Sequence, residues 1–547
     1  MTRVPGSVVR MTFTVGLALL VSAGSGCAAG ARGPSAATST AVAPTEAAAG
    51  ARLQALRRYI HDAWAPLTRT LAALPAAAVD AKAAHTAGAP WPVYVARDED
   101  PRGIEKGLAA VLSPAALATI ELRRLPDDPR QLREPGLLFL PRPYVVPGGR
   151  FNEMYGWDSY FILLGLLADE RVDLARDLTD NFLYEVRHYG GVLNANRTYY
   201  LTRGQPPFLS EMVLATYRAS GDRRWLAEAR AAVVAEHAHW TSPPHLLPDL
   251  GLSRYFDHGE GPAPEVVAGE RDAAGRSHYD RVREWYRTHD VPDYDLSAFY
   301  RRETDQLTPL FFRGDRSMRE SGFDPSDRFG PFSVDIIHYA PVCLNTLLFA
   351  MENDLAEIDR ALGRAADAAA WTELAGTRRA RIDQHLWDQA AGLYFDFNFT
   401  AGRRRAYPFA TSFWPLWAGL ASPAQAARVR ANLQLFERPG GIVTSTRVSG
   451  SQWDAPFGWA PLQLFAVEGL RRYGFSADAD RVARSFLNML VEDFERRGTL
   501  VEKYDVIRRT SAIGAALQFG YGSNEVGFGW TNGVALRLLD GLETRAR

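Results

Sequence analysis

Helical periodicity recurs along most of this chain and constrains its possible folds more than any other feature. In one segment, apolar residues return every four positions and give a helix a single apolar stripe, formed by Val482, Phe486, Leu490 and Phe494. A second helix is expected to begin after Ser422, because Pro423 suits the first helical position. We find no series of alternating strands, and short extended pieces such as residues 392–397 are typical of hairpins between helices. The pattern predicts an all-α fold, either a helical bundle or a toroid of helices.

Composition narrows the classes of function. The 547 residues carry 62 Lys and Arg against 63 Asp and Glu, so the chain lacks the basic excess of a nucleic-acid-binding protein. Its two cysteines are too few for a disulfide scaffold or a cysteine-based zinc site. Its 13 tryptophans are notable, since an indole ring outside the core offers a flat surface to a ligand such as a sugar. These values favour a large soluble enzyme or binding protein.

The first 27 residues have the pattern of an export signal. A positively charged start precedes an apolar run over residues 11–23, which is shorter than the about 20 residues that a membrane-spanning helix needs. Cys27 follows small residues, as the acylated cysteine of bacterial lipoproteins does, although Gly24 stands where those signals usually have leucine. The alternative is an ordinary cleavage site with Cys27 incidental. We favour the lipoprotein-type signal, which predicts an exported bacterial protein, periplasmic or tethered to a membrane through a lipidated Cys27.

Domain organisation follows from the composition along the chain. Residues 28–51 consist almost entirely of Ala, Ser, Thr, Gly and Pro, so they are predicted to form a flexible tether with little to bury. From residue 52 to the end, no stretch has the composition of an interdomain linker. We therefore expect one large helical domain over residues 52–547, which acts as a monomer.

A Gly-rich loop at residues 147–160 carries an unusual set of side chains. It brings Arg150, Trp157 and Asp158 together just before an apolar helix. Taken singly, Asp158 would be a helix N-cap and Trp157 a core residue. Together, an arginine, a carboxylate and an aromatic ring are the groups that bind a polyhydroxylated ligand.

A second loop, at residues 451–461, repeats this combination. Trp453 and Trp459 flank a turn rich in Pro and Gly, Asp454 lies between them, and a further helix follows. Here too, aromatic rings accompany a carboxylate in front of a helix. The two loops are therefore the strongest candidates for a ligand site.

Both loops resemble the signature motifs of the α,α-trehalase family, which comprises inverting glycoside hydrolases with an (α/α)6 toroid. The first loop agrees with the pattern PGGRF-x-E-x-Y-x-W-D-x-Y-F and the second with QWD-x-P-x-GWAP. Four further family segments occur in the expected order, at residues 194–207, 319–324, 501–505 and 527–533. The resemblance covers most of the chain, and it implies an all-α (α/α)6 toroid with short β-hairpins in its loops.

The resemblance also implies hydrolysis of α,α-trehalose to two glucose molecules by two carboxyl groups. By position in the motifs, Asp324 is the general acid and Glu502 the general base, which in inverting enzymes lie about 6.5–9.5 Å apart so that water fits between base and sugar. Without the motifs, Asp324 before Pro325 would be a turn residue, and Glu502 beside Lys503 an exposed charge. The acid needs burial or a negative neighbour to stay protonated near neutral pH.

The family pattern supplies the residues expected to bind the sugar. It assigns this role to Arg150, Trp157, Asp158, Asn194, Arg203, Gln205, Glu265 and Gly322, with Trp453 and Trp459 as platforms or pocket walls. The resemblance thus implies a small-molecule disaccharide as the partner. No motif for a metal or a nucleotide accompanies these residues, so we expect no cofactor.

Three departures from the pattern leave the exact substrate open. Ala263 stands where most bacterial members have a substrate-binding arginine, and Arg254 or Arg271 are candidates to replace that arginine. Tyr521 stands where the family's Gly-rich lid has a glutamate. Residues 266–298, which are rich in charge and tyrosine, look like an insertion that is either a solvated helix and loop or a segment that covers the site.

Two alternatives to trehalose hydrolysis follow from these departures. The first is a related inverting hydrolase that acts on another α-glucoside. The second is a catalytically silent sugar-binding lipoprotein. Retention of both Asp324 and Glu502 argues against the second, because a binding protein has no use for a paired acid and base.

Overall fold

The computed structural model describes residues 46–547 apart from residues 84, 129, 130, 133, 270, 292, 293 and 547. The predicted signal peptide, its Cys27 and most of the predicted tether lie outside the described residues. Helix α1 (Glu46–Leu67) begins inside the segment predicted as a tether, because glutamate followed by three alanines is a run of strong helix formers. Residues 50–547 form one compact unit.

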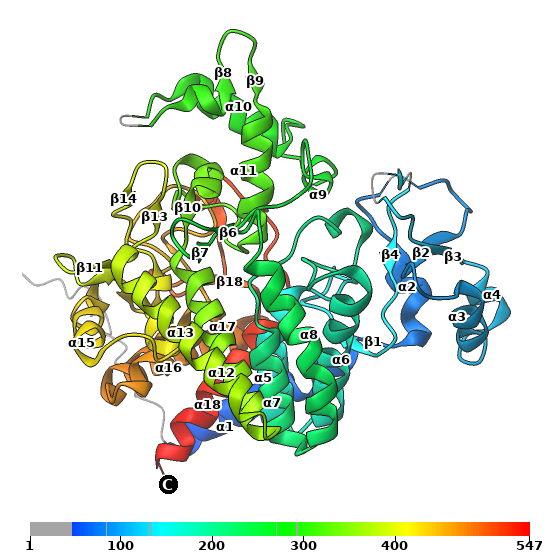
Figure 1. Ribbon diagram of the computed structural model, residues 1–547, viewed down its shortest axis with the longest axis horizontal. Coiled ribbons are helices and arrows are strands. Elements are labelled where there is room, and N and C mark those ends of the chain that lie inside the picture. Colours follow the sequence, from blue (N-terminus) through cyan, green and yellow to red (C-terminus); the bar gives the residue numbers. More distant parts are fainter. Residues whose placement is uncertain are drawn as a thin grey trace, which may run out of the picture. The chain divides into compact units, whose positions relative to one another are not determined.

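Six helices form a closed inner ring. Each contacts the next one along the chain, and the last contacts the first, so the ring has no open end. In chain order these helices are α5 (Gly156–Ala168), α7 (Leu209–Ser220), α12 (Val342–Ala361), α14 (Trp414–Trp417), α16 (Ala460–Arg472) and α18 (Gly529–Ala546). Figure 1 shows α5, α7, α12 and α18 grouped together in the lower part of the view.

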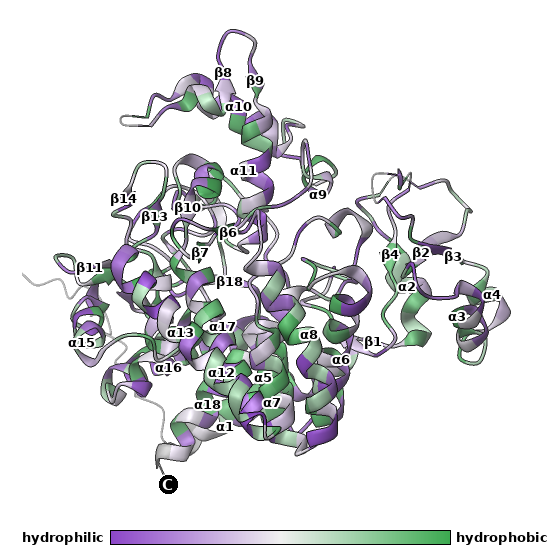
Figure 2. Ribbon diagram, viewed as in Figure 1, coloured by the Kyte–Doolittle hydropathy of each residue, from purple (hydrophilic) through white to green (hydrophobic). Residues whose placement is uncertain are grey.

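A second set of six helices alternates with the inner ring along the chain. These helices are α1, α6 (Val172–Tyr189), α8 (Arg223–Trp240), α13 (Ala365–His385), α15 (Pro423–Ala431) and α17 (Ser476–Arg497). Inner helix α12 buries 16 of its 20 residues, whereas α13 after it buries only four of 21 along one face. Figure 2 shows the resulting concentration of hydrophobic residues on α5 and α12. The predicted (α/α)6 toroid is confirmed.

The start of α15 lies where the sequence predicted it, and other helix ends have similar caps. Ser422 caps α15: its side chain accepts a hydrogen bond from the backbone of Gln425, whose side chain bonds back to the cap. Asp222 caps α8 by accepting from the backbone N–H of Trp225 at 3.0 Å. Helix α6 ends at Gly190, which adopts the left-handed conformation at φ 93°.

Two glycines allow the ring to close where α18 meets α5. A Cβ atom on Gly533 would lie 2.0 Å from the carbonyl oxygen of Phe161, and one on Gly165 would lie 2.5 Å from the Cα of Gly533. No other residue type permits this backbone approach. The last inner helix therefore packs directly on the backbone of the first.

Short strands in the loops hold the predicted site segments side by side. Strand β17 (Phe457–Trp459) pairs antiparallel with β18 (Lys503–Asp505), and Trp459 lies opposite Lys503. Val501 bridges to Val526, and Tyr155 bridges to Ala195. These pairings join the two signature loops to the segments that carry the other candidate residues.

One small sheet lies outside the sequence prediction. Strands β2 (Trp91–Val95), β3 (Ile120–Arg124) and β4 (Leu137–Leu138) form a parallel sheet in the order β3-β2-β4, whereas the sequence indicated hairpins only. Strands this short give little periodicity from which to infer a sheet. Among the described residues, no helix is both long and apolar enough to span a bilayer.

The predicted insertion packs into an apolar cluster that it shares with the segments that follow it. It contains α10 (His278–Thr288), and it is followed by the hairpin of β8 (Tyr300–Arg301) and β9 (Gln306–Leu307) and by α11 (Pro309–Glu320). Figure 1 shows these elements together, beyond the ends of the inner helices. Their buried cluster includes Phe519, which belongs to the segment between β18 and α18. The insertion is thereby packed against the Gly-rich segment that carries Tyr521.

Candidate active site

Eleven of the twelve residues expected at the site line one cavity of about 220 Å³. Most of them lie in loops that lead into the N-terminal ends of inner helices, so closure of the ring brings them together. The eleven are Arg150, Trp157, Asp158, Asn194, Arg203, Gln205, Glu265, Gly322, Asp324, Trp453 and Glu502. Within the part of the chain that the structure describes, no cluster of three or more His, Cys, Asp or Glu side chains is arranged to hold a metal ion.

Asp324 lies in the turn that follows α11. Its side chain is 30% exposed, and Nη1 of Arg319 lies 3.4 Å from its Oδ2. Gln452 donates a hydrogen bond from its side-chain amide to the backbone carbonyl of Asp324. Burial raises the pKa of Asp324 to about 7, while the charges of Arg319 and Arg203 act against this rise. A carboxyl group with this pKa is partly protonated at neutral pH, as a general acid must be.

Glu502 is buried, with only 2% of its surface exposed, so it is not the surface charge that its neighbour Lys503 could suggest. The hydroxyl of Tyr521 donates a hydrogen bond to its Oε1, and Nζ of Lys503 lies 3.6 Å from its Oε2. The indole N–H of Trp530 donates a hydrogen bond to the backbone carbonyl oxygen of Glu502 at 3.1 Å. Burial raises the pKa of Glu502, whereas Lys503 and Tyr521 oppose that rise. Both neighbours favour the ionised form that a general base needs.

Asp158 is the third residue of α5, while Tyr155 occupies the N-cap position. Asp158 is therefore not the cap of this helix. Its side chain lines the cavity, where burial, followed by the charge of Glu502, raises its pKa well above the usual range for aspartate. Gln205 fixes the start of the helix, because its Oε1 accepts a hydrogen bond from the backbone N–H of Trp157 at 2.9 Å.

Arg203 forms a charged wall of the cavity. Its guanidinium contacts Glu265 at 2.5 Å and Asp257 at 3.5 Å, and it lies 4.9 Å from the centre of the Tyr200 ring. Burial acts to raise the pKa of Glu265, but the charges of Arg203 and Arg319 lower it overall. The carboxylate of Glu265 is thereby kept ionised beside the sugar-sized space.

Arg150 lies between the first signature loop and the Gly-rich segment. Its Nε is 3.2 Å from Oε1 of Glu525, and its guanidinium lies 5.3 Å from the centre of the Tyr521 ring. The Gly-rich segment therefore contacts this side of the cavity.

Neither of the two arginines that the sequence suggested as a replacement for the arginine missing at Ala263 lines the cavity. Arg254 donates to backbone carbonyls at 2.8 and 2.9 Å, Arg271 donates to another backbone carbonyl at 2.8 Å, and neither side chain lines the cavity. Arg319 lines it instead, held 3.0 Å from Oδ1 of Asp315. Tyr279 of the insertion donates to the same carboxylate at 2.8 Å. The insertion thus helps to orient Arg319.

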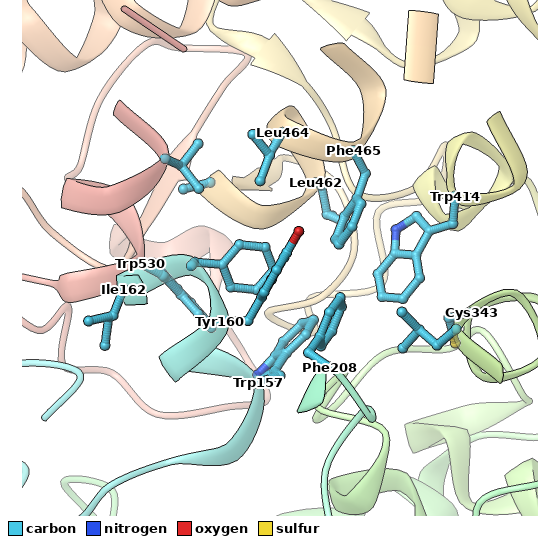
Figure 3. Close-up of a cluster of buried hydrophobic side chains, with 14 of the residues drawn as sticks. Trp157, Tyr160, Ile162, Phe208, Cys343, Trp414, Leu462, Leu464, Phe465 and Trp530 are labelled. Atoms are coloured by element: carbon cyan, nitrogen blue, oxygen red, sulfur yellow. The ribbon is translucent and has the colours of Figure 1, made fainter. Parts of the chain in front are cut away.

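Stacked tryptophan rings form one wall of the cavity. Trp453 lines it, and Trp459 stacks behind Trp453 with ring centres 3.9 Å apart and planes 8° apart. Trp459 is fully buried and does not face the cavity. Figure 3 shows Trp157 and Trp530 within the buried aromatic cluster. Gly322, at φ +75°, passes so close to Trp157 that a Cβ atom would lie 3.0 Å from the indole.

Several polar residues of the cavity were not predicted from the sequence to bind the sugar. They include Gln452, Tyr521, Arg319, His278 and Arg281. Gln452 and Arg319 lie inside motifs that the sequence displayed, so the motifs themselves were the available signal. His278 and Arg281 come from the insertion. Neither a motif nor a periodicity in that segment predicts that their side chains face the cavity.

The fold and the site together define a class of protein. A closed ring of six helix pairs carries four carboxyl groups, four arginines and three indole rings around one cavity, which is the architecture of an (α/α)6 toroid with a glycosidase-type site. The sequence matches the family described as Trehalase over residues 36–543. The chain belongs to the trehalase family.

Named relatives agree with this membership. The chain is 38% identical to the cytosolic neutral trehalases of Neurospora crassa and Saccharomyces cerevisiae, over 72% and 74% of its length. These matches cover 57% of each fungal enzyme, so the chain spans little more than half of their length. The solved structure of neutral trehalase Nth1 from Saccharomyces cerevisiae superposes with a TM-score of 0.75 at 34% identity, covering 91% of this chain and 95% of that one.

These comparisons overturn the predicted location. The sequence indicated an exported bacterial protein, periplasmic or anchored through Cys27, but the fungal relatives are named as cytosolic enzymes. That prediction is therefore wrong. It was based on the first 27 residues alone, where a positively charged start, a short apolar run and a cysteine were the signals, and these residues lie outside the described part of the chain.

Proposed function

We propose that this protein hydrolyses α,α-trehalose to two glucose molecules with inversion at the attacked carbon. The observation that carries the proposal is the placement of Asp324 and Glu502 in one cavity, with neighbours that favour opposite roles. Burial raises the pKa of Asp324 to about 7, which suits a proton donor. Tyr521 and Lys503 surround Glu502 with groups that favour its carboxylate, which suits a base.

In this mechanism Asp324 gives its proton to the oxygen that bridges the two sugars. The bond between this oxygen and the anomeric carbon of one sugar then breaks. Glu502 takes a proton from a water molecule, whose oxygen attacks the same carbon from the opposite face. One glucose is released as the β-anomer and the other as the α-anomer. Arg150, Arg203 and Arg319 supply paired donors for sugar hydroxyls, because the guanidinium presents its N–H groups in a fixed planar fork.

The remaining expected residues have supporting roles in the proposal. Asp158, Asn194 and Glu265 offer acceptors to sugar hydroxyls, and Trp157 and Trp453 offer ring faces. Gln205 and Gly322 act by placing Trp157, and Trp459 acts by backing Trp453. All of these groups come from one chain, which supports activity as a monomer. The names of the fungal relatives favour a cytoplasmic location.

Proton NMR tests the reaction directly. The purified protein is incubated with trehalose, and the anomeric signals are followed before mutarotation equilibrates them. We expect equal early signals of α- and β-glucose. Early release of α-glucose alone would contradict inversion, and absence of turnover would contradict the proposed activity.

A related hydrolase that acts on another α-glucoside is the second candidate. The observation that favours it is the altered wall of the cavity, where Ala263 is buried and Arg281 and His278 of the insertion line the space. The same NMR assay with a panel of α-glucosides decides between the candidates. Turnover of another disaccharide without turnover of trehalose would select this second candidate.

A further inference from the structure

A continuous set of buried polar contacts joins the two candidate catalytic groups through the protein. Gln452 donates from its side-chain amide to the carbonyl oxygen of Asp324, and its Oε1 accepts from Nζ of Lys503 at 3.2 Å. The same ammonium donates to the carbonyl oxygen of Tyr521 at 3.1 Å. The hydroxyl of Tyr521 then donates to Glu502. The contacts therefore connect the turn that carries Asp324 with the side chain of Glu502.

Lys503 is the centre of these contacts and is fully buried. Its ammonium lies 3.8 Å from the centre of the Tyr521 ring and 5.7 Å from that of Trp459. It is not among the residues that line the cavity, so it does not reach a bound sugar. A buried ammonium is costly unless its donors are satisfied, which the two carbonyl oxygens and the nearby carboxylate of Glu502 achieve here.

We propose that Lys503 is a positioning residue, and that with Gln452 it forms a buried crosspiece that fixes the turn of Asp324 against the segment of Glu502. The sequence gives a reason for the design. Gln452 opens the motif QWD and Lys503 follows the base in VEKYD, so each end of the crosspiece lies beside a residue of the site. Strand pairing of β17 with β18 brings the two motifs into contact.

The crosspiece has a consequence for catalysis. An inverting enzyme needs a gap between acid and base that admits one water molecule, so the separation of the two carboxyl groups must be held closely. A displacement of about 1 Å is enough to lower a rate about 100-fold. This inference rests on the proposed function, because it concerns the geometry of that same reaction.

The crosspiece also carries charge. Nζ of Lys503 lies 3.6 Å from Oε2 of Glu502, a buried oxygen with no hydrogen-bond partner among the residues that the structure describes. The other groups that act on Glu502 are Tyr521, Arg150, Glu525 and Asp158. Arg150 and Glu525 pair with each other at 3.2 Å, so their effects on Glu502 oppose one another. Loss of the ammonium should therefore raise the pKa of Glu502.

The test compares Lys503→Met and Lys503→Arg with the wild-type enzyme. For Lys503→Met we expect kcat on trehalose to fall about 100-fold with little change in KM. The acid limb of the kcat/KM profile should move up by at least about one pH unit, because a charge within 4–6 Å of a carboxylate shifts its pKa by this much or more. Lys503→Arg keeps the charge, so its acid limb should stay at the wild-type position.

A lysine that only filled space would give a different result. It would reduce the amount of folded enzyme and leave the acid limb of Lys503→Met unmoved, and that outcome overturns the inference. Lys106→Met, in the exposed last turn of α3 (Pro101–Leu108), is the matched control and should behave as wild type. Circular dichroism and thermal unfolding report whether each variant folds.

Gln452→Met decides the question if Lys503→Met does not fold. It removes both contacts of the amide while the ammonium remains, so kcat should fall at least about 10-fold while the acid limb stays within half a unit of wild type. Wild-type kcat in Gln452→Met would refute the crosspiece. Failure of the wild-type enzyme to hydrolyse trehalose would instead refute the proposed function, so the two failures are distinct.

Discussion

Replacing Arg319 by methionine should move the alkaline limb of the pH–rate profile upward. The general acid must carry its proton, and burial places the pKa of Asp324 at about 7, so the rate is expected to fall as pH rises through that value. Nη1 of Arg319 lies 3.4 Å from Oδ2 of Asp324, where its charge favours the ionised carboxylate. Without that charge, Asp324 keeps its proton to higher pH, and the enzyme stays active there.

Coulomb's law gives the size of this shift. At the 3.4 Å separation of Arg319 and Asp324, two unit charges interact by about 1.2 kcal/mol in bulk water and by about 5 kcal/mol at an effective dielectric constant of about 20. Asp324 is 30% exposed, so solvent screening places the value toward the lower end. An interaction of about 2 kcal/mol corresponds to about 1.5 pH units.

The assay is the initial rate of glucose release from trehalose, measured as kcat/KM across the neutral and alkaline range. Arg271→Met is the matched control, because Arg271 is an exposed arginine outside the cavity and should leave the profile unchanged. The KM of Arg319→Met should also rise, since a donor for sugar hydroxyls is lost. An alkaline limb that stays in place or moves to lower pH in the folded variant would refute the reasoning.

Two further predictions concern the proposed catalytic pair and two glycines. Asp324→Asn and Glu502→Gln should each unfold at the wild-type temperature and lose at least about 1,000-fold in kcat; a residual rate near wild type would remove that residue from the mechanism. Gly322→Ala should lower stability by about 1–2 kcal/mol in thermal unfolding and raise KM, because a left-handed residue gains a Cβ against Trp157. Gly376→Ala, in an exposed and open part of α13, should instead raise stability by about 0.5–1 kcal/mol; equal effects of the two alanines would contradict this.

The helical architecture was predictable because each helix has its own periodic spacing of apolar residues, which does not depend on the rest of the fold. Ser422 and Pro423 marked the start of α15, and the stripe through Val482 and Phe486 marked the buried face of α17. The parallel sheet was not predictable, because β2 is five residues long and its partners lie 25 to 45 residues further along the chain. Such pairings depend on where distant segments are placed by the rest of the fold.

The residues that form the motifs could be predicted to gather around one cavity. Ten of those residues and Glu265 meet in one cavity, because the loops that carry most of them lead into the inner helices of a closed ring. The direction of each side chain was not predictable. Trp453 and Trp459 are alike in the sequence, but the stacking of one behind the other leaves only Trp453 at the cavity.

The sequence by itself determined the family and the helical class, and it predicted the two carboxyl groups proposed for catalysis, because motifs and periodicity are local properties of the chain. Only the tertiary structure decided which groups surround those carboxyls. Arg319 reaches Asp324 because Asp315 and the insertion hold it, and Lys503 reaches Gln452 across 51 positions of sequence because β18 pairs with β17. Charge and spacing at the site depend on such long-range contacts, which form only when the ring of helices closes.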